Sequence, residues 1–180
     1  ATLHQHAAGA SSETVDTSTR YAALLDAMAL RACETAHAFK PQELCNLLWA
    51  FATLKVRHPR LFEACAESAA TRLAGFTPQG LSQTAWAYSK LGLGKHRGLL
   101  LGAAQVAAPK LDSYDAHSIA TLAWALANLE LEHAPLLRAV CAEAARRPEQ
   151  FGVASCAQLL WALSRLSDGV EAAAVRAMSA

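Results

Sequence analysis

The sequence lacks the motifs that identify most enzymes. Its 180 residues contain no phosphate-binding loop, no HExxH zinc motif, no GxSxG nucleophile elbow and no evident pair of catalytic carboxylates. Charge is sparse as well, because 16 Lys and Arg nearly balance 15 Asp and Glu, for a net charge of +1. So small a net charge argues against indiscriminate binding to nucleic acid. We therefore expect a protein that is not an enzyme and that has neither a cofactor nor a metal site.

Membrane, disulfide and targeting features are missing too. No apolar run reaches the ~20 residues that a membrane-spanning helix needs, so we expect no direct membrane span. The five cysteines form no CxxC pair and fall inside helical patterns, which favours small buried thiols in a reducing compartment. The sequence does not begin with Met, which indicates a processed or trimmed form. Residues 1–20 carry two acids and almost no Arg, unlike a transit or signal peptide.

A sequence repeat is the main feature that is present. Its marker is a tryptophan in the phrases PQELCNLLWAFATL, PQGLSQTAWAYSKL, AHSIATLAWALANL and VASCAQLLWALSRL, at Trp49, Trp86, Trp124 and Trp161. These tryptophans are 37, 38 and 37 residues apart. A fixed period in this range is typical of stacked helical repeats. The sequence therefore predicts an all-α fold, an α-solenoid of helix–turn–helix repeats with a 37–38-residue period.

The period divides the chain into an arm and a single α-solenoid. Residues 1–18 are rich in Ala, Ser, Thr and Gly and are expected to be a flexible N-terminal arm. The solenoid spans residues 19–180. It comprises a half repeat and four repeats, at residues 21–38, 39–75, 76–113, 114–150 and 151–180. In the last repeat we expect an SDG turn after Leu166 to lead into a short second helix from Val170 to about Met178.

Positions within each first helix can be counted from the aromatic residue that opens the repeat, at Phe39, Phe76, Tyr114 or Phe151. Positions +5, +8, +9, +12 and +15 form an apolar stripe, which should pack on the second helix. Positions +6 and +13 are always small, which predicts that neighbouring first helices approach closely. The tryptophans at +10 are interpreted as wedges between first helices, and platforms for stacked bases are the alternative.

Positions +3, +7 and +14 project close together from the face opposite the apolar stripe. None of them is an acid, whereas exposed helix faces usually carry Glu and Lys. Amides can pair with base edges, and basic residues could contact phosphates. We therefore predict a binding surface for RNA or for a partner, with an ordinary solvated face as the alternative. This polar ladder comprises Gln42, Asn46, Thr53, Gln79, Gln83, Lys90, His117, Thr121, Asn128, Gln158 and Arg165, with Ala154 at the remaining position.

A second set of candidate residues lies in the turns between the two helices of a repeat. Residues 39–113 hold nine Lys and Arg against four Asp and Glu, whereas each flank has a net charge of −2. Basic turn residues could bind phosphates in a salt-dependent way. The turn histidines His58, His96 and His133 lie too far apart for a shared metal and are expected to be exposed to solvent. The set, which we call the basic edge, comprises Lys55, Arg57, Arg60, Lys95 and Arg97.

The phrases PQxLxxxxWAxxxL and PQGLSQTAWAYSKLG resemble the octotricopeptide repeat family of algae. They are also similar to the heptatricopeptide repeats that accompany RAP domains in apicomplexan and dinoflagellate organelle proteins. The resemblance covers roughly residues 21–169. It implies an organellar α-solenoid that binds RNA in the chloroplast or the mitochondrion. It also implies a fixed place in a larger assembly such as the mitoribosome.

Two functions stay open on the sequence alone. The first is a non-catalytic RNA-binding protein of an organellar ribonucleoprotein, whose partner is rRNA or an organellar transcript. The second is a protein-binding scaffold or accessory subunit of a large organellar complex, such as a photosystem, which contacts neighbouring protein subunits with the same surface. The family resemblance and the acid-free ladder favour the first function, whereas the near-neutral charge favours the second.

Overall fold

The computed structural model describes residues 21–178, with side chains as far as Leu166. The expected N-terminal arm lies outside this range. All regular structure in residues 21–178 is helical, which confirms the all-α fold class. Short 3-10 helices join the α-helices at η1 (Leu73–Gly75), η2 (Gly94–His96), η3 (Ala108–Ser113) and η4 (Pro148–Gln150). The α-helices are α2 (Ala22–Thr35), α3 (Pro41–Thr53), α4 (Pro59–Ala70), α5 (Pro78–Lys90), α6 (Arg97–Ala107), α7 (Ala116–Asn128), α8 (Ala134–Arg146) and α9 (Val153–Met178).

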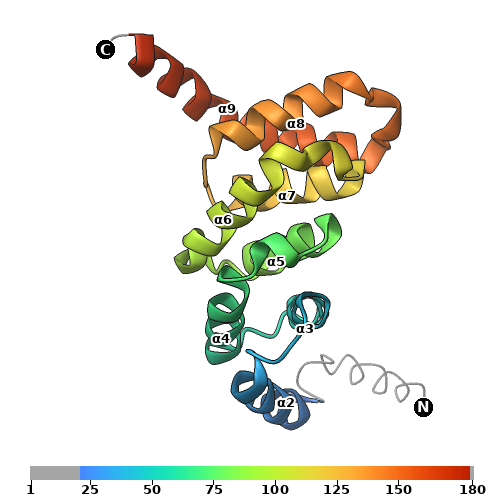
Figure 1. Cartoon of the computed structure of the whole chain (residues 1–180), viewed down its shortest axis with the longest axis vertical. Helices are drawn as coiled ribbons and strands as arrows, with labels where there is room; N and C mark the ends of the chain where they lie inside the picture. The colour runs from blue at the N-terminus through green and yellow to red at the C-terminus, as the bar shows by residue number, and fades with distance from the viewer. Residues whose placement is uncertain (1–20, 179–180) are drawn as a thin grey trace, which may run out of the picture.

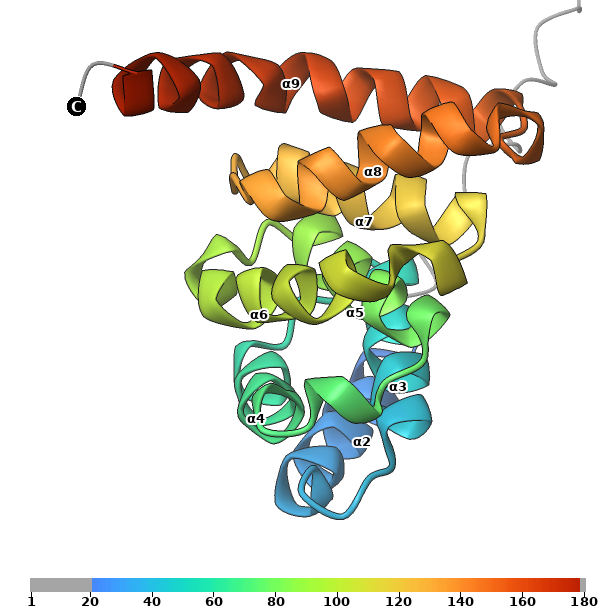
Figure 2. The same cartoon turned by 45° about the horizontal axis from the view of Figure 1, so that its top comes forward.

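Alternate helices form two rows. Helices α3, α5, α7 and α9 contact one another in that order and form the first row, while α2, α4, α6 and α8 form the second row. The helices follow one another in chain order along the long axis of the molecule, from α2 at one end to α8 and α9 at the other (Figure 1). Helix α9 lies across the far end as one long rod (Figure 2). Helices α5 and α7 therefore each pack between two helices of the first row. Helices α3 and α9, at the ends of the row, each contact only one other described helix of that row.

Local capping explains where the first-row helices begin. Thr77 Oγ1 accepts a hydrogen bond from the amide three residues on, at 3.1 Å, and Asp115 Oδ1 accepts the equivalent bond at 2.6 Å, so both residues are N-caps. Lys40 has no acceptor side chain, and its own amide donates to the Glu43 carboxylate at 2.7 Å instead. All four first-row helices consequently start two residues after the aromatic residue that opens the repeat.

The first three of these helices end in the same kind of turn. One residue in each turn has a positive φ, at Lys55 (57°), Gly92 (64°) and Glu130 (55°). The next residue is apolar, and its amide donates to the carbonyl five residues earlier at 2.9 Å. This pattern is the Schellman motif, which closes a helix when an apolar residue packs back onto it. The apolar residues are Val56, Leu93 and Leu131.

The expected turn after Leu166 is wrong, because α9 continues as one helix of 26 residues to Met178. At the position of the apolar turn residue the fourth repeat has Asp168. A carboxylate is poorly suited to the buried place that Leu93 and Leu131 occupy, since burial of an unpaired charge is costly. The helix therefore runs on instead of closing. Despite the length of α9, no helix in residues 21–178 is long and apolar enough to cross a membrane.

Small residues bring the first-row helices together, as their spacing predicts. Cys45 Sγ donates to the carbonyl oxygen of Gly80 at 3.3 Å between α3 and α5. Ser82 Oγ donates to the carbonyl oxygen of Ser118 at 2.9 Å between α5 and α7. Side chains at both points are at most 2% exposed. Larger residues would force the two backbones apart and break these contacts.

The cysteines are less uniformly buried than expected. Cys45 and Cys65 are buried, Cys33 and Cys156 are half-buried, and Cys141 is exposed. The expectation is wrong for Cys141 because it lies on the side of α8 that faces solvent, in a stretch where Ala142 is also exposed. Burial raises the pKa of the Cys65 thiol to about 12 and also raises the pKa of Cys45.

Candidate RNA- and partner-binding surface

The polar ladder has three positions in each repeat, +3, +7 and +14, and we call each of these positions a rung. The first rung, position +3, is in register on all four first-row helices. Gln42, Gln79, His117 and Ala154 are each the second residue of their helix, and all four are exposed. The helices that carry them pack side by side in order. Equivalent positions on such helices follow one another in a row, so this rung gives a line of accessible polar groups that no second-row helix covers.

The last rung, position +14, is exposed as well, but only part of it is free to bind. Thr53 and Lys90 end α3 and α5 with their side chains in solvent. Asn128 Nδ2 already donates to the carbonyl oxygen of Ser89 at 3.2 Å and to its hydroxyl oxygen at 3.0 Å. Asn128 therefore ties α7 to α5, and Lys90 is the member best placed to meet a phosphate.

The fourth residue of this rung has an acidic neighbour. Arg165 Nη2 donates to Glu130 Oε1 at 3.0 Å, in an ion pair between α9 and the turn after α7. The same guanidinium lies 5.9 Å from the ring centroid of Trp161. Both partners are largely exposed, so this pair is weak and can exchange for a phosphate. The ladder is therefore free of acids in sequence but has one carboxylate beside it in space.

The middle rung, position +7, faces the neighbouring first-row helix more than solvent. Asn46 is exposed and accepts a hydrogen bond from Gln42 Nε2 at 3.0 Å. Gln83 and Gln158 are half-buried, and Thr121 is only 6% exposed. Gln83 Oε1 is buried without a hydrogen-bond partner among the described residues. The centre of the ladder thus contributes more to packing than to an accessible surface.

The tryptophans lie between neighbouring first-row helices, as wedges would, where such neighbours are present. The rings of Trp124 and Trp161 lie 6.1 Å apart between their centroids. Trp86 and Trp124 are partly buried and pack against the core. Trp49 and Trp161, on the end helices of the row, are 47% and 40% exposed. A tryptophan is therefore covered where it has first-row neighbours on both sides.

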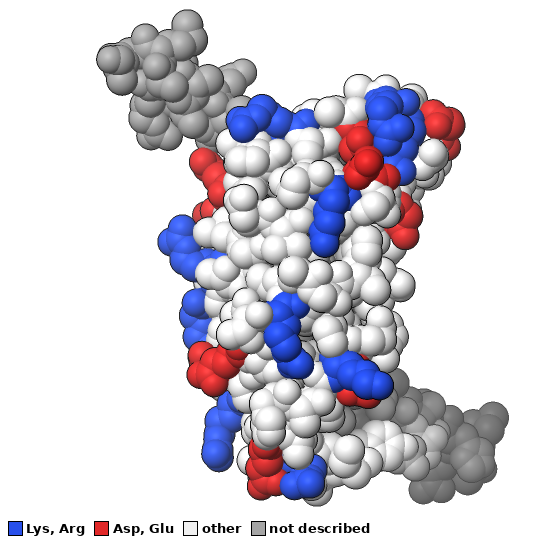
Figure 3. Space-filling view, viewed as in Figure 1, with Lys and Arg blue, Asp and Glu red and all other residues white. Residues whose placement is uncertain are grey.

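The basic edge is exposed but not continuous. All five of its residues have side chains in solvent. Lys95 forms an ion pair with Glu63, and this hydrogen bond lowers the pKa of the Glu63 carboxyl group. Figure 3 shows Lys and Arg side chains at separate places along one face, with uncharged surface between them. Such a face favours a few separate phosphate contacts over a continuous electrostatic groove.

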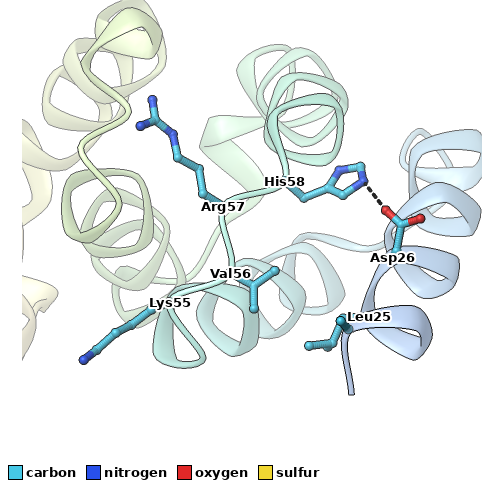
Figure 4. Close-up of a pocket in the computed structure, with 7 residues that line it drawn as sticks. Leu25, Asp26, Lys55, Val56, Arg57 and His58 are labelled. Carbon is cyan, nitrogen blue, oxygen red and sulfur yellow. Dashed lines mark ion pairs between the residues drawn. The ribbon is translucent and has the colours of Figure 1, made fainter. Parts of the chain in front are cut away.

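A cavity of about 520 Å³ adjoins the basic edge between α2 and the turn after α3. Leu25 and Val56 contribute apolar walls. His58 turns toward α2 and its Nε2 lies 3.3 Å from Asp26 Oδ1, whereas Lys55 and Arg57 extend away from α2 (Figure 4). Lys55 and Arg57 line this cavity, but their charged ends point away from His58 and Asp26 and do not converge on one point (Figure 4).

The turn histidines are structural, and the expectation that they are exposed is wrong. His58 Nδ1 and His133 Nδ1 each accept a hydrogen bond at 3.1 Å from the amide three residues on, so they cap α4 and α8. Both are half-buried. His96 is 8% exposed and packs edge-on against Tyr88, with 5.1 Å between ring centroids. Burial lowers the pKa of His96 in spite of the opposing effect of Glu63.

Two arginines that were not predicted to matter hold the repeats closed. Arg72 Nη1 donates to the carbonyl oxygen of Phe39 at 2.9 Å, and Arg147 Nη2 donates to that of Tyr114 at 2.6 Å. Each arginine lies 33 residues after the aromatic residue that opens its repeat. That shared spacing is the sequence signal that could have revealed them. Because their donors are used inside the fold, both arginines are poor candidates for RNA contact.

The polar groups of the described residues can be sorted by their chemistry. Within them no group of three or more His, Cys, Asp or Glu side chains lies close enough to hold a metal ion. The accessible polar groups are amides, hydroxyls, a histidine and separate basic residues, which suit reversible contact with a polymer that carries both phosphates and hydrogen-bonding edges.

The comparison with known proteins identifies one family. The chain matches no curated protein. The sequence pattern of the RNA-editing substrate-binding complex 6 protein family (RESC6) matches residues 15–172. This match agrees with the RNA-related part of the resemblance and gives no support to its octotricopeptide part. Since the match covers most of the sequence, the chain belongs to the RNA-editing substrate-binding complex 6 protein family.

Proposed function

We propose that this chain is a non-catalytic, RNA-binding subunit of an RNA-editing complex in the mitochondrion. The name of its family supports a place in such a complex. The family is known from the mitochondria of protists, which favours that organelle over the chloroplast. An RNA-editing complex thereby replaces the mitoribosome as the proposed assembly, and an editing substrate or guide replaces rRNA as the proposed RNA.

The observation that carries this proposal is the line of exposed polar groups on the first row. Gln42, Gln79 and His117 occupy the same helical position and are all exposed, and no acid stands at any ladder position. We take the two rows to be an α-solenoid with the 37–38-residue period of the sequence. In this arrangement a single RNA strand runs across successive repeats along the line, at about one base per repeat.

Separate residues serve the two halves of a nucleotide. The amides of Gln42 and Gln79 offer a donor and an acceptor to a base edge. Lys90 and the basic edge contact phosphates as point charges. Thr121 and Asn128 take little part, because one is buried and the other is bonded to Ser89. Binding on this scale is short-range and modest in affinity, which suits a subunit held in place by its neighbours.

The test is the affinity for short single-stranded RNA across a series of salt concentrations. We expect binding that weakens with salt and that fails in the Lys90→Glu/Arg165→Glu variant. In the unmodified chain each phosphate contact should add about 0.7 to the magnitude of the slope of log K against log salt, so these two residues account for about 1.4 of it. The matched control is Arg31→Glu/Arg138→Glu, which changes the net charge equally at exposed residues of the second row.

Equal loss in the two double variants would mean that overall charge, and not the ladder, determines the affinity. Absence of binding at low salt would favour the second candidate function, a protein-binding scaffold. That candidate has one specific observation in its favour. Helix α9, at the end of the first row, exposes large apolar side chains, and an exposed apolar patch of this kind is typical of a protein-binding site.

A further inference from the structure

One face of α9 is apolar and uncovered. Val153 is 89% exposed and Leu160 is 67% exposed. Ala157 and Ser164 are exposed on the same side. These four residues follow the i, i+4, i+7, i+11 spacing of a single helical face. We call them the end face of the first row.

The equivalent residues of the preceding first-row helices are buried. Position +9, which is Leu160 in α9, is 0% exposed at Leu48, Ala85 and Ala123. Positions +6 and +13 are at most 2% exposed in α3, α5 and α7, whereas Ala157 and Ser164 lie in solvent. At positions +6 and +13 the next helix of the row covers the face, as the hydrogen bonds of Cys45, Ser82 and Ser89 show. The end face is therefore a continuation of an interface that the fold already uses three times.

The earlier junctions show what kind of helix fits such a face. A side chain at position +6 reaches the backbone of the next helix at position +4, as Cys45 does at Gly80 and Ser82 does at Ser118. Both receiving residues are small and buried. An amide can also bond to the small residue at +13, as Asn128 does to Ser89. The matching helix thus has a small, uncharged residue, Gly or Ser, at the point of closest approach.

A second copy of this chain fits poorly. The helix at the other end of the row, α3, has Leu47, Ala50 and Leu54 half-exposed on its corresponding side. At the point of closest approach, however, α3 carries Glu43, where α5 and α7 carry Gly80 and Ser118. Glu43 is exposed and holds the amide that starts α3. A carboxylate at this position opposes close contact with Ala157 and Leu160 of another copy.

We propose that the end face docks an amphipathic helix of a partner protein, with an uncharged contact face, which continues the first row. The partner helix places Gly or Ser against Ala157 and an apolar side chain against Leu160. It covers Val153 and packs on Trp161 in the way that Trp161 itself packs on Trp124. Such docking uses shape and apolar area without charge, so it is separate from the RNA contacts of the polar ladder.

The experiment uses the whole chain and a peptide of its own residues 114–131, labelled with a fluorophore and blocked at both ends. This peptide is an ideal probe because its sequence forms α7, which already packs onto such a face. Fluorescence anisotropy measures its binding to the unmodified chain, to Leu160→Gln and to the control Leu24→Gln. Leu24 is 58% exposed on α2, at the opposite end of the molecule.

We expect saturable binding that weakens about tenfold or more in Leu160→Gln and not in Leu24→Gln. A Ser118→Glu peptide, which imitates Glu43, should bind about tenfold or more weakly to the unmodified chain. No saturable binding, or binding that ignores Leu160→Gln, would overturn the proposal. Circular dichroism of Leu160→Gln is the control for folding: an unchanged helical content would show that a loss of binding is not a loss of fold.

Two further measurements test whether the end face binds a second copy of the chain or RNA instead of a partner helix. Sedimentation of the chain alone would reveal oligomers that Leu160→Gln disperses if the occupant were a second copy. Affinity for short single-stranded RNA would fall in Leu160→Gln if the face bound nucleotides. Either result overturns the proposal of a partner helix. The Lys90→Glu variant, changed on α5 far from the end face, should keep its affinity for the peptide, so failure of RNA binding and failure of helix docking are distinguishable.

Discussion

Removal of the Tyr88 hydroxyl group tests how the two rows are joined. Tyr88 lies on α5 with 0% exposure, and its hydroxyl donates to the carbonyl oxygen of Phe62 on α4 at 2.7 Å. Its ring packs edge-on against Phe62, with 5.2 Å between centroids. Burial also raises the pKa of Tyr88, so the hydroxyl is protonated and available as a donor at neutral pH.

The Tyr88→Phe change removes this one hydrogen bond and keeps the ring. No cavity forms, so the cost is the lost bond together with a buried carbonyl oxygen that has one partner fewer. We expect the free energy of unfolding to fall by about 2 kcal/mol. For a chain of 180 residues this corresponds to a drop in Tm of about 4–8 °C. Chemical denaturation followed by circular dichroism measures the change directly.

Tyr114 provides a matched control. It is 1% exposed, yet its hydroxyl has no hydrogen-bond partner among the described residues. The Tyr114→Phe change should therefore leave stability unaltered or raise it by up to about 1 kcal/mol, because it removes a polar group from an apolar site. If both variants lost the same stability, the hydrogen bond from Tyr88 would not be what joins α5 to α4, and the reasoning would fail.

Three other predictions concern turns, protonation and thiols. Gly92→Ala should lower the free energy of unfolding by about 1 kcal/mol in a denaturant melt, because the φ of residue 92 is 64° although a Cβ there would meet no atom within 4 Å. Lys55→Gly, at a residue that also has a positive φ, should raise the free energy of unfolding by up to about 1 kcal/mol and lower the affinity for RNA. Because burial lowers the pKa of His96, the unfolded chain binds the proton more tightly, so stability should fall below about pH 6.5, and fall less in His96→Gln. Mass spectrometry of the folded protein should show that Cys141 is alkylated first and Cys65 last, and the reverse order would contradict the burial of these thiols.

Much of the fold follows from local chemistry that a sequence displays. Thr77 and Asp115 directly precede helical patterns and cap them, and such a cap can be read from the sequence because it depends only on a few neighbouring residues. The small residues Cys45 and Ser82 mark the contacts of the first row, since their repeat spacing shows that neither face tolerates bulk. The exposed position of Gln42 and its counterparts also follows from helical periodicity alone.

What could not be predicted depends on neighbours that are distant in sequence. His96, like His58, directly precedes a second-row helix, but it is buried against Tyr88, a contact that no local pattern reveals. Asn128 looks like an open amide until α5 brings Ser89 beside it. The wrong prediction of a turn after Leu166 is of another kind, because the sequence itself contained the contrary signal. The other three repeats have an apolar residue at the turn position that Asp168 occupies, and only the SDG sequence suggested a turn.

The junctions between first-row helices depend on backbone carbonyl groups. Cys45 and Ser82 both donate to main-chain oxygens, so the receiving helix is recognised by its backbone and by the absence of a bulky side chain. At these two points the junction places only a steric condition on the side chain of the receiving residue. Whole units can therefore be duplicated, exchanged or diverge in evolution without a matching change in the neighbour, and the exposed side chains are left free to acquire new specificities.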